Sequence, residues 1–270
     1  MMRIVLILSI LGTFLPAARS SGSQTPTERA WLILQQGLAD KTAEKRANAV
    51  HALRLLPNDP RAQGMAENVL GDQSPKVRAA AARALGPMGA MSSVPKLKAV
   101  LNDKQPAVVL AAARSLFLLG DRDEAYEIDY EVLIGERKCA DGFVESQINE
   151  LKNPKAVAMM GVETGIGFVP FAGTGYEAFK RINKDDSSPI RAAAARELAT
   201  DHDPKIGAAL ARACSDKKWR VRAAAVDAIA KRDDPALLNA ITPALDDKSD
   251  IVRFDASAAV LRLSSEKTSK

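Results

Sequence analysis

The sequence predicts an all-α protein, a right-handed α-solenoid of stacked antiparallel helix pairs that is interrupted by a glycine-rich insert. A phrase that opens with Asp and runs into an Ala-rich stretch occurs six times, and its opening Asp recurs at intervals of 32, 31, 82, 31 and 31 residues. A fixed period of this length is typical of stacked repeats. The composition agrees, because 47% of the 270 residues are hydrophobic but only 4% are aromatic, so small side chains would fill close helix interfaces.

Each unit is predicted to be a helix, a turn and a second helix. In residues 72–85 (DQSPKVRAAAARAL), Ser74 is expected to cap the first helix and Pro75 to occupy its first position. Gly86 and Pro87 then end that helix. Residues 91–101 place apolar side chains on one side of a second helix. No single pair can bury its apolar face alone, so the pairs are expected to stack.

An Arg follows the opening Asp by six residues in five of the six units. We expect each Asp to accept hydrogen bonds from turn amides and each Arg to pair with carboxylates along the stack, which would form a ladder. The alternative is that these residues are solvated charges that flank a turn. Unit three has Val109 in place of the Arg. The expected ladder consists of Asp40, Asp72, Asp103, Asp185, Asp216 and Asp247 with Arg46, Arg78, Arg191, Arg222 and Arg253.

The pattern D-x-x-x-x-[VI]-R-x-x-A-x-x-A-[LI], which covers most of residues 40–263, resembles HEAT repeats, specifically the short phycobilisome-lyase-like kind. The resemblance implies a helical solenoid whose second helices line the concave side. It implies little about function, because scaffolds, assembly factors, lyases, hydroxylases and nucleic-acid binders share the fold. The His-Glu pairs of the metal-dependent HEAT-repeat hydroxylases have no counterpart in this sequence. Chromophore lyases of this kind act on cytoplasmic antenna proteins, whereas this chain is expected to be exported.

Residues 1–20 are predicted to be a signal peptide. Arg3 precedes a short apolar run, and Ala18-Arg19-Ser20 has the small-x-small pattern of a cleavage site. The protein is therefore expected to be exported, and to be periplasmic or secreted after cleavage near Ser20. The alternative is an N-terminal membrane anchor, which the short run disfavours. Removal of Arg3 and Arg19 would lower the formal net charge from +5 to +3.

The rest of the chain divides into five segments. Residues 21–39 are predicted to be a linker and a capping helix, because Thr25 and Glu28 form a capping box and the helix with Trp31 resembles the second half of a repeat. Such a half-unit would cap a solenoid end. Units one to three occupy residues 40–133 and units four to six occupy residues 185–263. A divergent helical segment with the glycine-rich insert occupies residues 134–184, and a polar tail occupies residues 264–270.

Two segments supply the candidate partner contacts. The second helix of unit three is acidic, and the concave side is where a basic partner would dock. The insert, residues 161–175, could be folded core with glycines at tight turns, a partner-contacting loop or a membrane hairpin. It lacks the Lys and Ser or Thr of a phosphate-binding loop. The candidate contacts are Glu124, Glu127, Glu131, Phe168, Phe171 and Tyr176.

No residue pattern predicts catalysis, a cofactor or a metal. The two histidines, His51 and His202, lie in different units, and Asp203 is expected to cap a helix after His202. Cys139 and Cys214 are far apart in the sequence, so two buried thiols are favoured over a disulfide. No basic stripe with interleaved aromatics suggests nucleic-acid binding.

The sequence therefore favours an exported, non-catalytic scaffold that binds another protein. The alternatives are a periplasmic enzyme or enzyme subunit that uses the insert as a pocket wall, and a membrane-associated adaptor.

Overall fold

The computed structural model describes residues 24–133 and 187–265, and every regular element within them is helical. This confirms the predicted all-α solenoid of helix pairs. The α-helices are α1 Pro26–Leu38, α2 Ala43–Ala52, α3 Pro60–Asn68, α4 Pro75–Leu85, α5 Val94–Val100, α6 Pro106–Leu118, α7 Arg122–Leu133, α11 Ser188–Glu197, α12 Pro204–Ala213, α13 Trp219–Arg232, α14 Leu238–Ile241 and α15 Asp250–Ser264. Short 3-10 turns are η1 Leu53–Leu55, η2 Met91–Ser93, η3 Leu198–Thr200, η4 Pro235–Leu237 and η5 Thr242–Asp246.

The helix starts follow from local chemistry. Thr25 and Glu28 form the predicted capping box, in which the Glu28 amide donates to Thr25 Oγ1 at 3.2 Å and the Thr25 amide donates to Glu28 Oε2 at 2.9 Å. Asp203 caps α12, as predicted, by accepting from the Lys205 amide at 2.9 Å. Ser74 is the N-cap residue of α4 and Pro75 occupies the first position, as predicted, but the Ser74 side chain makes no capping hydrogen bond.

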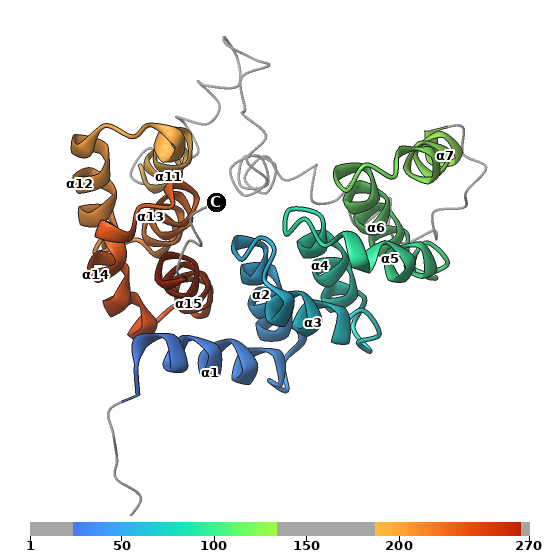
Figure 1. The fold of residues 1–270 in the computed structure, drawn as a ribbon, viewed down its shortest axis with the longest axis horizontal. Coiled ribbons are helices and arrows are strands. Elements are labelled where there is room, and N and C mark those ends of the chain that lie inside the picture. The colour runs from blue at the N-terminus through green and yellow to red at the C-terminus, as the bar shows by residue number, and fades with distance from the viewer. Residues whose placement is uncertain (1–23, 134–186, 266–270) are drawn as a thin grey trace, which may run out of the picture.

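The helices form two layers that follow an arc (Figure 1). The first helices of the units, namely α11, α13, α15, α2, α4 and α6, lie on the inner side of the arc, and the second helices lie outside them. The expectation that second helices line the concave side is therefore wrong. The Ala-rich first helices have neighbours on both sides, and small side chains allow this close approach.

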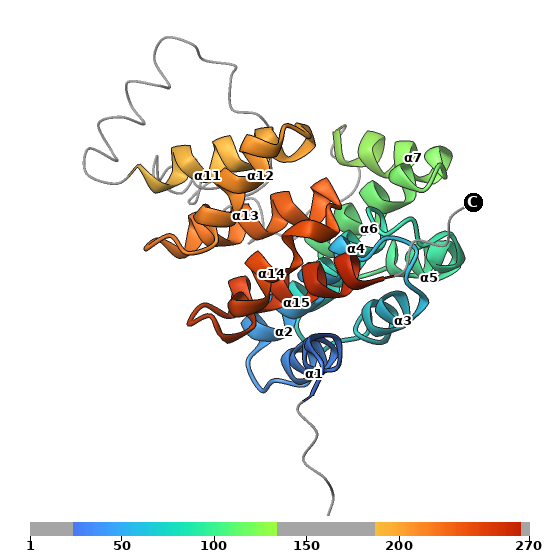
Figure 2. The same ribbon diagram turned by 60° about the vertical axis from the view of Figure 1, so that its left-hand side comes forward.

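The order of the units in the stack differs from their order in the sequence. Helix α15 of unit six packs against α2 of unit one, so the stack runs through units four, five, six, one, two and three. Helix α1 packs against α15 and α2 and supplies the second-layer helix for α15. Figure 2 shows α1 end-on at the bottom of the view. The expected cap at a solenoid end is thus a joint in the middle of the stack.

The α1–α15 joint is tightly packed. Leu34 is fully buried, and the ring of Phe254 is 4% exposed. A Cβ on Gly37 would lie 2.8 Å from the Cβ of Ala49 and closer still to the Phe254 ring, so only glycine fits without a shift. The contact between α1 and α15 is therefore part of the hydrophobic core. It joins two helices that are more than 200 residues apart in the sequence.

Several predictions lie outside the described residues, namely the signal peptide, the divergent segment 134–184 with its insert, the end of the tail, and Asp185. Among the helices that the structure describes, none is long and apolar enough to cross a membrane.

Candidate protein-binding surface

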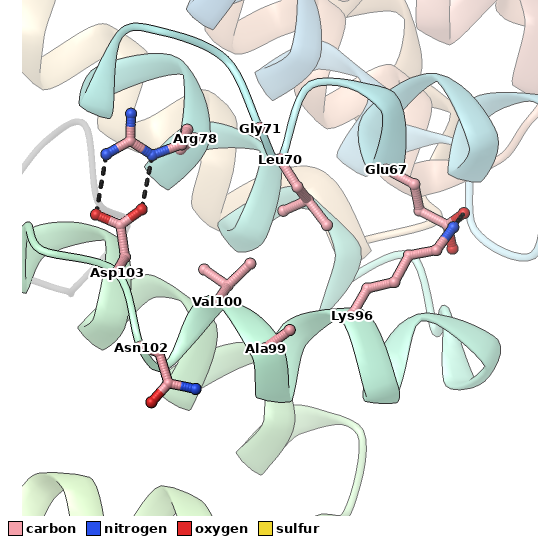
Figure 3. Close-up of a pocket in the computed structure, with 9 residues that line it drawn as sticks. All are labelled: Glu67, Leu70, Gly71, Arg78, Lys96, Ala99, Val100, Asn102 and Asp103. Atoms are coloured by element: carbon pink, nitrogen blue, oxygen red, sulfur yellow. Dashed lines mark hydrogen bonds and ion pairs between the residues drawn. The ribbon is translucent and has the colours of Figure 1, made fainter.

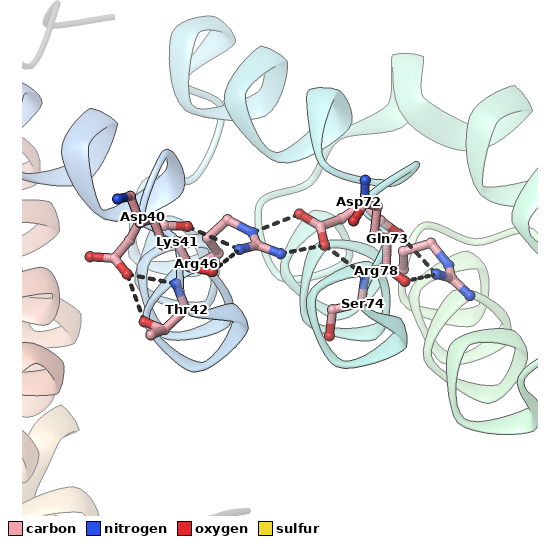
Figure 4. A network of polar contacts seen from close by, with 8 residues as sticks. All are labelled: Asp40, Lys41, Thr42, Arg46, Asp72, Gln73, Ser74 and Arg78. Atoms are coloured by element: carbon pink, nitrogen blue, oxygen red, sulfur yellow. Dashed lines mark hydrogen bonds and ion pairs between the residues drawn. The ribbon is translucent and has the colours of Figure 1, made fainter.

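The structure places four of the predicted ladder pairs together. Arg46 Nε lies 2.8 Å from Asp72 Oδ2, and Arg78 Nε lies 2.7 Å from Asp103 Oδ2 (Figure 4 draws the first of these pairs). In the other half of the chain, Arg222 Nε lies 2.6 Å from Asp247 Oδ2, and Arg191 pairs with Asp216. Each Arg thus reaches the Asp of the next unit.

The same Asp also holds the turn of its own unit. The carboxylates of Asp40, Asp72, Asp103, Asp216 and Asp247 each accept the amide two residues later at 2.8 Å. The hydrogen bond from Arg46 holds the pKa of Asp72 below its usual range. In addition, Arg78 Nη1 donates to the Asp72 carbonyl at 2.8 Å. The repeated Asp and Arg therefore fix the stacking of neighbouring units and are not free to bind a partner.

The ladder is not continued where unit six meets unit one. Arg253 pairs with Asp250 in its own helix and donates to the Asp247 carbonyl at 2.6 Å. Asp40 accepts from Thr42 and lies 3.5 Å from Lys45 Nζ. The two halves of the chain are therefore joined by other contacts.

An ionic cluster on the inner layer, built around the buried residues Asp227 and Asp255, makes this connection. We call Arg54, Asp227, Lys231, Asp255 and His51 the junction cluster. Arg54 Nη2 lies 2.5 Å from Asp227 Oδ1, and its Nη1 lies 3.2 Å from Asp255 Oδ1. Lys231 Nζ lies 2.8 Å from Asp227 Oδ2, and Arg54 also donates to the His51 carbonyl at 3.1 Å. One arginine of the first half thus bridges two helices of the second half.

The surroundings within the junction cluster shift the pKa values of its members in opposite directions. Burial raises the pKa of Asp255, and the neighbouring Asp227 adds to this effect. Burial acts on Asp227 in the same sense, but Arg54 and Lys231 outweigh it and hold the pKa of Asp227 below its usual value. Arg54 and desolvation lower the pKa of His51 to about 3, so its ring is neutral near pH 7.

Next to the junction cluster, one line of basic residues follows the inner layer, and we call His51, Arg54, Arg83 and Arg114 the inner basic stripe. His51, Arg83 and Arg114 each come eleven residues after the opening Asp of their units. They lie on α2, α4 and α6, which pack side by side. All three residues are exposed, although most of the residues around them in these helices are buried or half-buried, and the helices that carry them form the inner layer of the arc.

Arg83 and Arg114 differ from the ladder arginines because neither has an ion pair or hydrogen bond with another described residue. Burial lowers the pKa of the Arg83 guanidinium, and the neighbouring Arg114 lowers it further. Two like charges on adjacent repeats repel, and nothing in the described residues compensates them. This is the arrangement expected of a surface that binds a negative group.

The stripe ends in an apolar surface on unit three. Phe117 and Leu118, the last two residues of α6, are each 50% exposed, which is unusual for large apolar side chains on an otherwise largely buried helix. The guanidinium of Arg122 lies 5.3 Å from the centre of the Phe117 ring. Tyr126 and Tyr130 stack on the adjoining helix α7 with ring centres 6.2 Å apart. Basic and apolar contacts therefore lie next to one another at this end of the arc.

A hollow of about 430 Å³ on the outer side is a weaker candidate (Figure 3). Glu67 and Lys96 border it and pair at 2.5 Å, and Arg78 and Asp103 border it and form a ladder pair. Its charged residues are thus already neutralised by one another, which leaves little to attract a ligand.

Of the residues predicted as partner contacts, the three glutamates are not on the helices of the inner basic stripe. Glu124, Glu127 and Glu131 belong to α7, which lies in the second layer, and the side chain of Glu127 is exposed. Phe168, Phe171 and Tyr176 lie outside the described residues. Sequence reasoning missed the stripe, although its signal was present as a basic residue or histidine at the same position of successive units.

The remaining candidate residues are accounted for structurally. Cys214 is a free, buried thiol, and burial raises its pKa to about 12. Cys139 lies outside the described residues. Among the residues that the structure describes, no group of three or more His, Cys, Asp or Glu side chains is placed to hold a metal ion.

The sequence matches the family of HEAT repeats over residues 32–117 and 177–262, which together make up more than half of the chain. The protein belongs to the HEAT-repeat family. No curated protein matches the sequence.

Three solved structures are similar in fold. Human deoxyhypusine hydroxylase is 20% identical, covers 89% of this chain and 85% of its own, and has a TM-score of 0.34. The complex of CpcE and CpcF of phycocyanin lyase from a Nostoc species is 21% identical, covers 84% of each chain and has a TM-score of 0.32. An engineered protein is 16% identical over 87% of this chain and 96% of its own, with a TM-score of 0.29.

These similar structures correct one prediction. The sequence was expected to encode a protein that is not an enzyme, but two of the three similar structures are named as a hydroxylase and a lyase. The prediction that the protein is not an enzyme is therefore withdrawn. At these identities the similarity concerns the fold and transfers no substrate.

Proposed function

We propose that this HEAT-repeat protein is an exported scaffold that binds another protein through the inner basic stripe. The observation that carries the proposal is the pair Arg83 and Arg114. They are exposed on successive units of the inner layer, and they have no ion pair with another described residue. The ladder arginines differ from this pair, because each of them forms an ion pair with a carboxylate.

The repeat architecture supports the same proposal, because HEAT solenoids are extended scaffolds whose curved surfaces suit protein binding. Phe117 and Leu118 add exposed apolar area beside the stripe. Arginine and aromatic side chains are enriched where protein partners bind.

The test is a crosslinking and pulldown experiment from the native host with the tagged full-length protein. The variant Arg83→Glu/Arg114→Glu is expected to lose a partner that the wild type captures. The control Lys104→Glu/Lys217→Glu makes the same change of charge at two exposed positions that directly follow ladder aspartates, and it should retain that partner. Equal capture by both variants would contradict the proposal.

Export is tested separately. Mass spectrometry of the N-terminus and fractionation of the host cell should find a chain cleaved near Ser20 outside the cytoplasm. A full-length chain retained in the cytoplasm would contradict this part of the proposal.

A further inference from the structure

The spacing of the cations in the inner basic stripe limits what can bind there. Packed helices lie about 8–10 Å apart, so Arg83 and Arg114, which occupy the same position on the adjacent helices α4 and α6, are separated by about one such step. His51 on α2 is one step further along the same line, but its ring is neutral near pH 7, so Arg83 and Arg114 are the cations that set the spacing. A matching ligand would present negative groups about 10 Å apart and on one side.

An extended polyproline II segment has this geometry. It has three residues per turn and rises about 3.1 Å per residue, so every third side chain faces the same way at intervals of about 9 Å. A β-strand would not match, because its side chains alternate and residues three apart face opposite ways. Glutamate or aspartate at every third position would therefore place one carboxylate at each arginine in turn.

The two ends of the stripe differ chemically, and this difference indicates which end of the ligand is charged and which is apolar. At one end the carboxylates of Asp227 and Asp255 already neutralise Arg54, so an anion gains little there. At the other end Phe117 follows Arg114 by one helical turn and offers an exposed ring. A peptide can supply an apolar side chain for this end. The bases of a nucleic acid can also stack on an aromatic ring, but nucleic-acid binding relies on many phosphate contacts, whereas the stripe has only Arg83 and Arg114 unpaired among the described residues.

We infer that the inner basic stripe binds an extended acidic peptide segment of the partner, with carboxylates at every third residue on Arg83 and Arg114 and an apolar residue on Phe117. This inference rests on the proposed function and specifies the chemistry of the partner. The carboxylates form charge-assisted hydrogen bonds with the two guanidinium groups and remove the repulsion between them.

The experiment measures binding of fluorescently labelled seven-residue peptides to the full-length protein by anisotropy at low salt. The first peptide has Glu at every third position, with Pro and Ser between them and a terminal Phe. The second has the same composition with the glutamates adjacent, and the third has Gln in place of Glu. The first should bind about tenfold more tightly than the third and measurably more tightly than the second, because two exposed ion pairs are each expected to contribute a few-fold.

Matched variants connect the binding to the stripe. Arg83→Gln/Arg114→Gln should lose the tenfold preference for the first peptide over the Gln peptide, and Lys104→Gln/Lys217→Gln should keep it. Both arginines are exposed and unpaired among the described residues, so the variant is expected to fold, which circular dichroism checks.

Three results would overturn the inference. The first is equal binding of the spaced and adjacent glutamate peptides, and the second is binding that the Arg83→Gln/Arg114→Gln variant retains. The third is stripe-dependent binding of a single-stranded oligonucleotide or of anionic phospholipid vesicles in place of the peptide. If the pulldown partner depends on the arginines while the peptides fail, only this inference is wrong. If the pulldown partner is indifferent to the arginines, the proposed function itself is wrong.

Discussion

Replacement of Arg54 by methionine tests whether the junction cluster holds the two halves of the chain together. The side chain of Arg54 is 20% exposed, and those of Asp227 and Asp255 are 6% and 7% exposed, so the change leaves two nearly buried carboxylates without their shared cation. Removing one partner of a buried ion pair destabilises a protein by about 3–5 kcal/mol. The lower end applies here, because Asp227 keeps Lys231 and the pKa of Asp255 is already raised, so Asp255 accepts a proton readily.

We therefore expect Arg54→Met to lower the free energy of unfolding by about 3 kcal/mol, which corresponds to a fall in Tm of about 6–12 °C for a domain of this size. Urea and thermal unfolding followed by circular dichroism measure this loss. The matched control is Lys76→Met, because Lys76 and Glu44 pair at the surface with 58% and 61% of their side chains exposed. Exposed pairs contribute about 0–1 kcal/mol.

Two further results would refute the reasoning about the junction cluster. A loss in Arg54→Met no larger than in Lys76→Met would show that the cluster contributes little. The double variant Arg54→Met/Asp255→Asn should recover part of the lost stability, because it removes the Asp255 carboxylate that Arg54→Met leaves without a cation. No recovery would show that the damage comes from packing and not from charge.

Two more predictions concern packing and pH. Gly37→Ala should lower the free energy of unfolding by about 1–3 kcal/mol, because the new Cβ would collide with the Phe254 ring. Gly64 lies in the interior of α3 with open space around it, so Gly64→Ala should raise the free energy of unfolding by about 0.5–1 kcal/mol. Equal effects of the two changes in chemical denaturation would contradict this prediction. The folded state lowers the pKa of His51 from 6.5 to about 3, so the neutral ring favours folding above pH 6.5 and this contribution is lost as the pH falls. His51→Gln should consequently lose less stability than the wild type between pH 7 and pH 4, and parallel pH profiles would show that His51 does not contribute.

The regular part of the structure could be predicted from the sequence because it depends on local chemistry that repeats. The opening Asp and the Arg six residues later recur in five units, and the structure shows why both are needed: the Asp holds its turn and the Arg reaches the next unit. Ser74 holds the predicted N-cap position, but its side chain makes no capping hydrogen bond, and the turn is held by the hydrogen bond from its amide to the Asp72 carboxylate.

The order of the stack could not be predicted in the same way. It depends on which helix faces fit across more than 200 residues, as with Gly37 against Phe254, and periodicity does not contain that information. One indication was present, because the helix of residues 26–38 resembles a second half-unit without a first. By sequence this helix resembles an end cap, whereas in the structure it packs against α15, the last first-layer helix in the sequence. The inner basic stripe was missed because the expected concave side was the wrong layer.

The pairing of α1 with α15 has a consequence for how the chain is made. In most solenoids each unit touches only its neighbours in the sequence, so folding can spread from one unit to the next during synthesis. Here α1 leaves the ribosome early, but the helix that covers its apolar face is the last to be made among those described. The entropy lost in closing so long a loop grows only slowly with its length, so the finished stack remains accessible. Until α15 has been made, the face of α1 that contacts it stays uncovered, so this part of the core cannot form before the described chain is nearly complete.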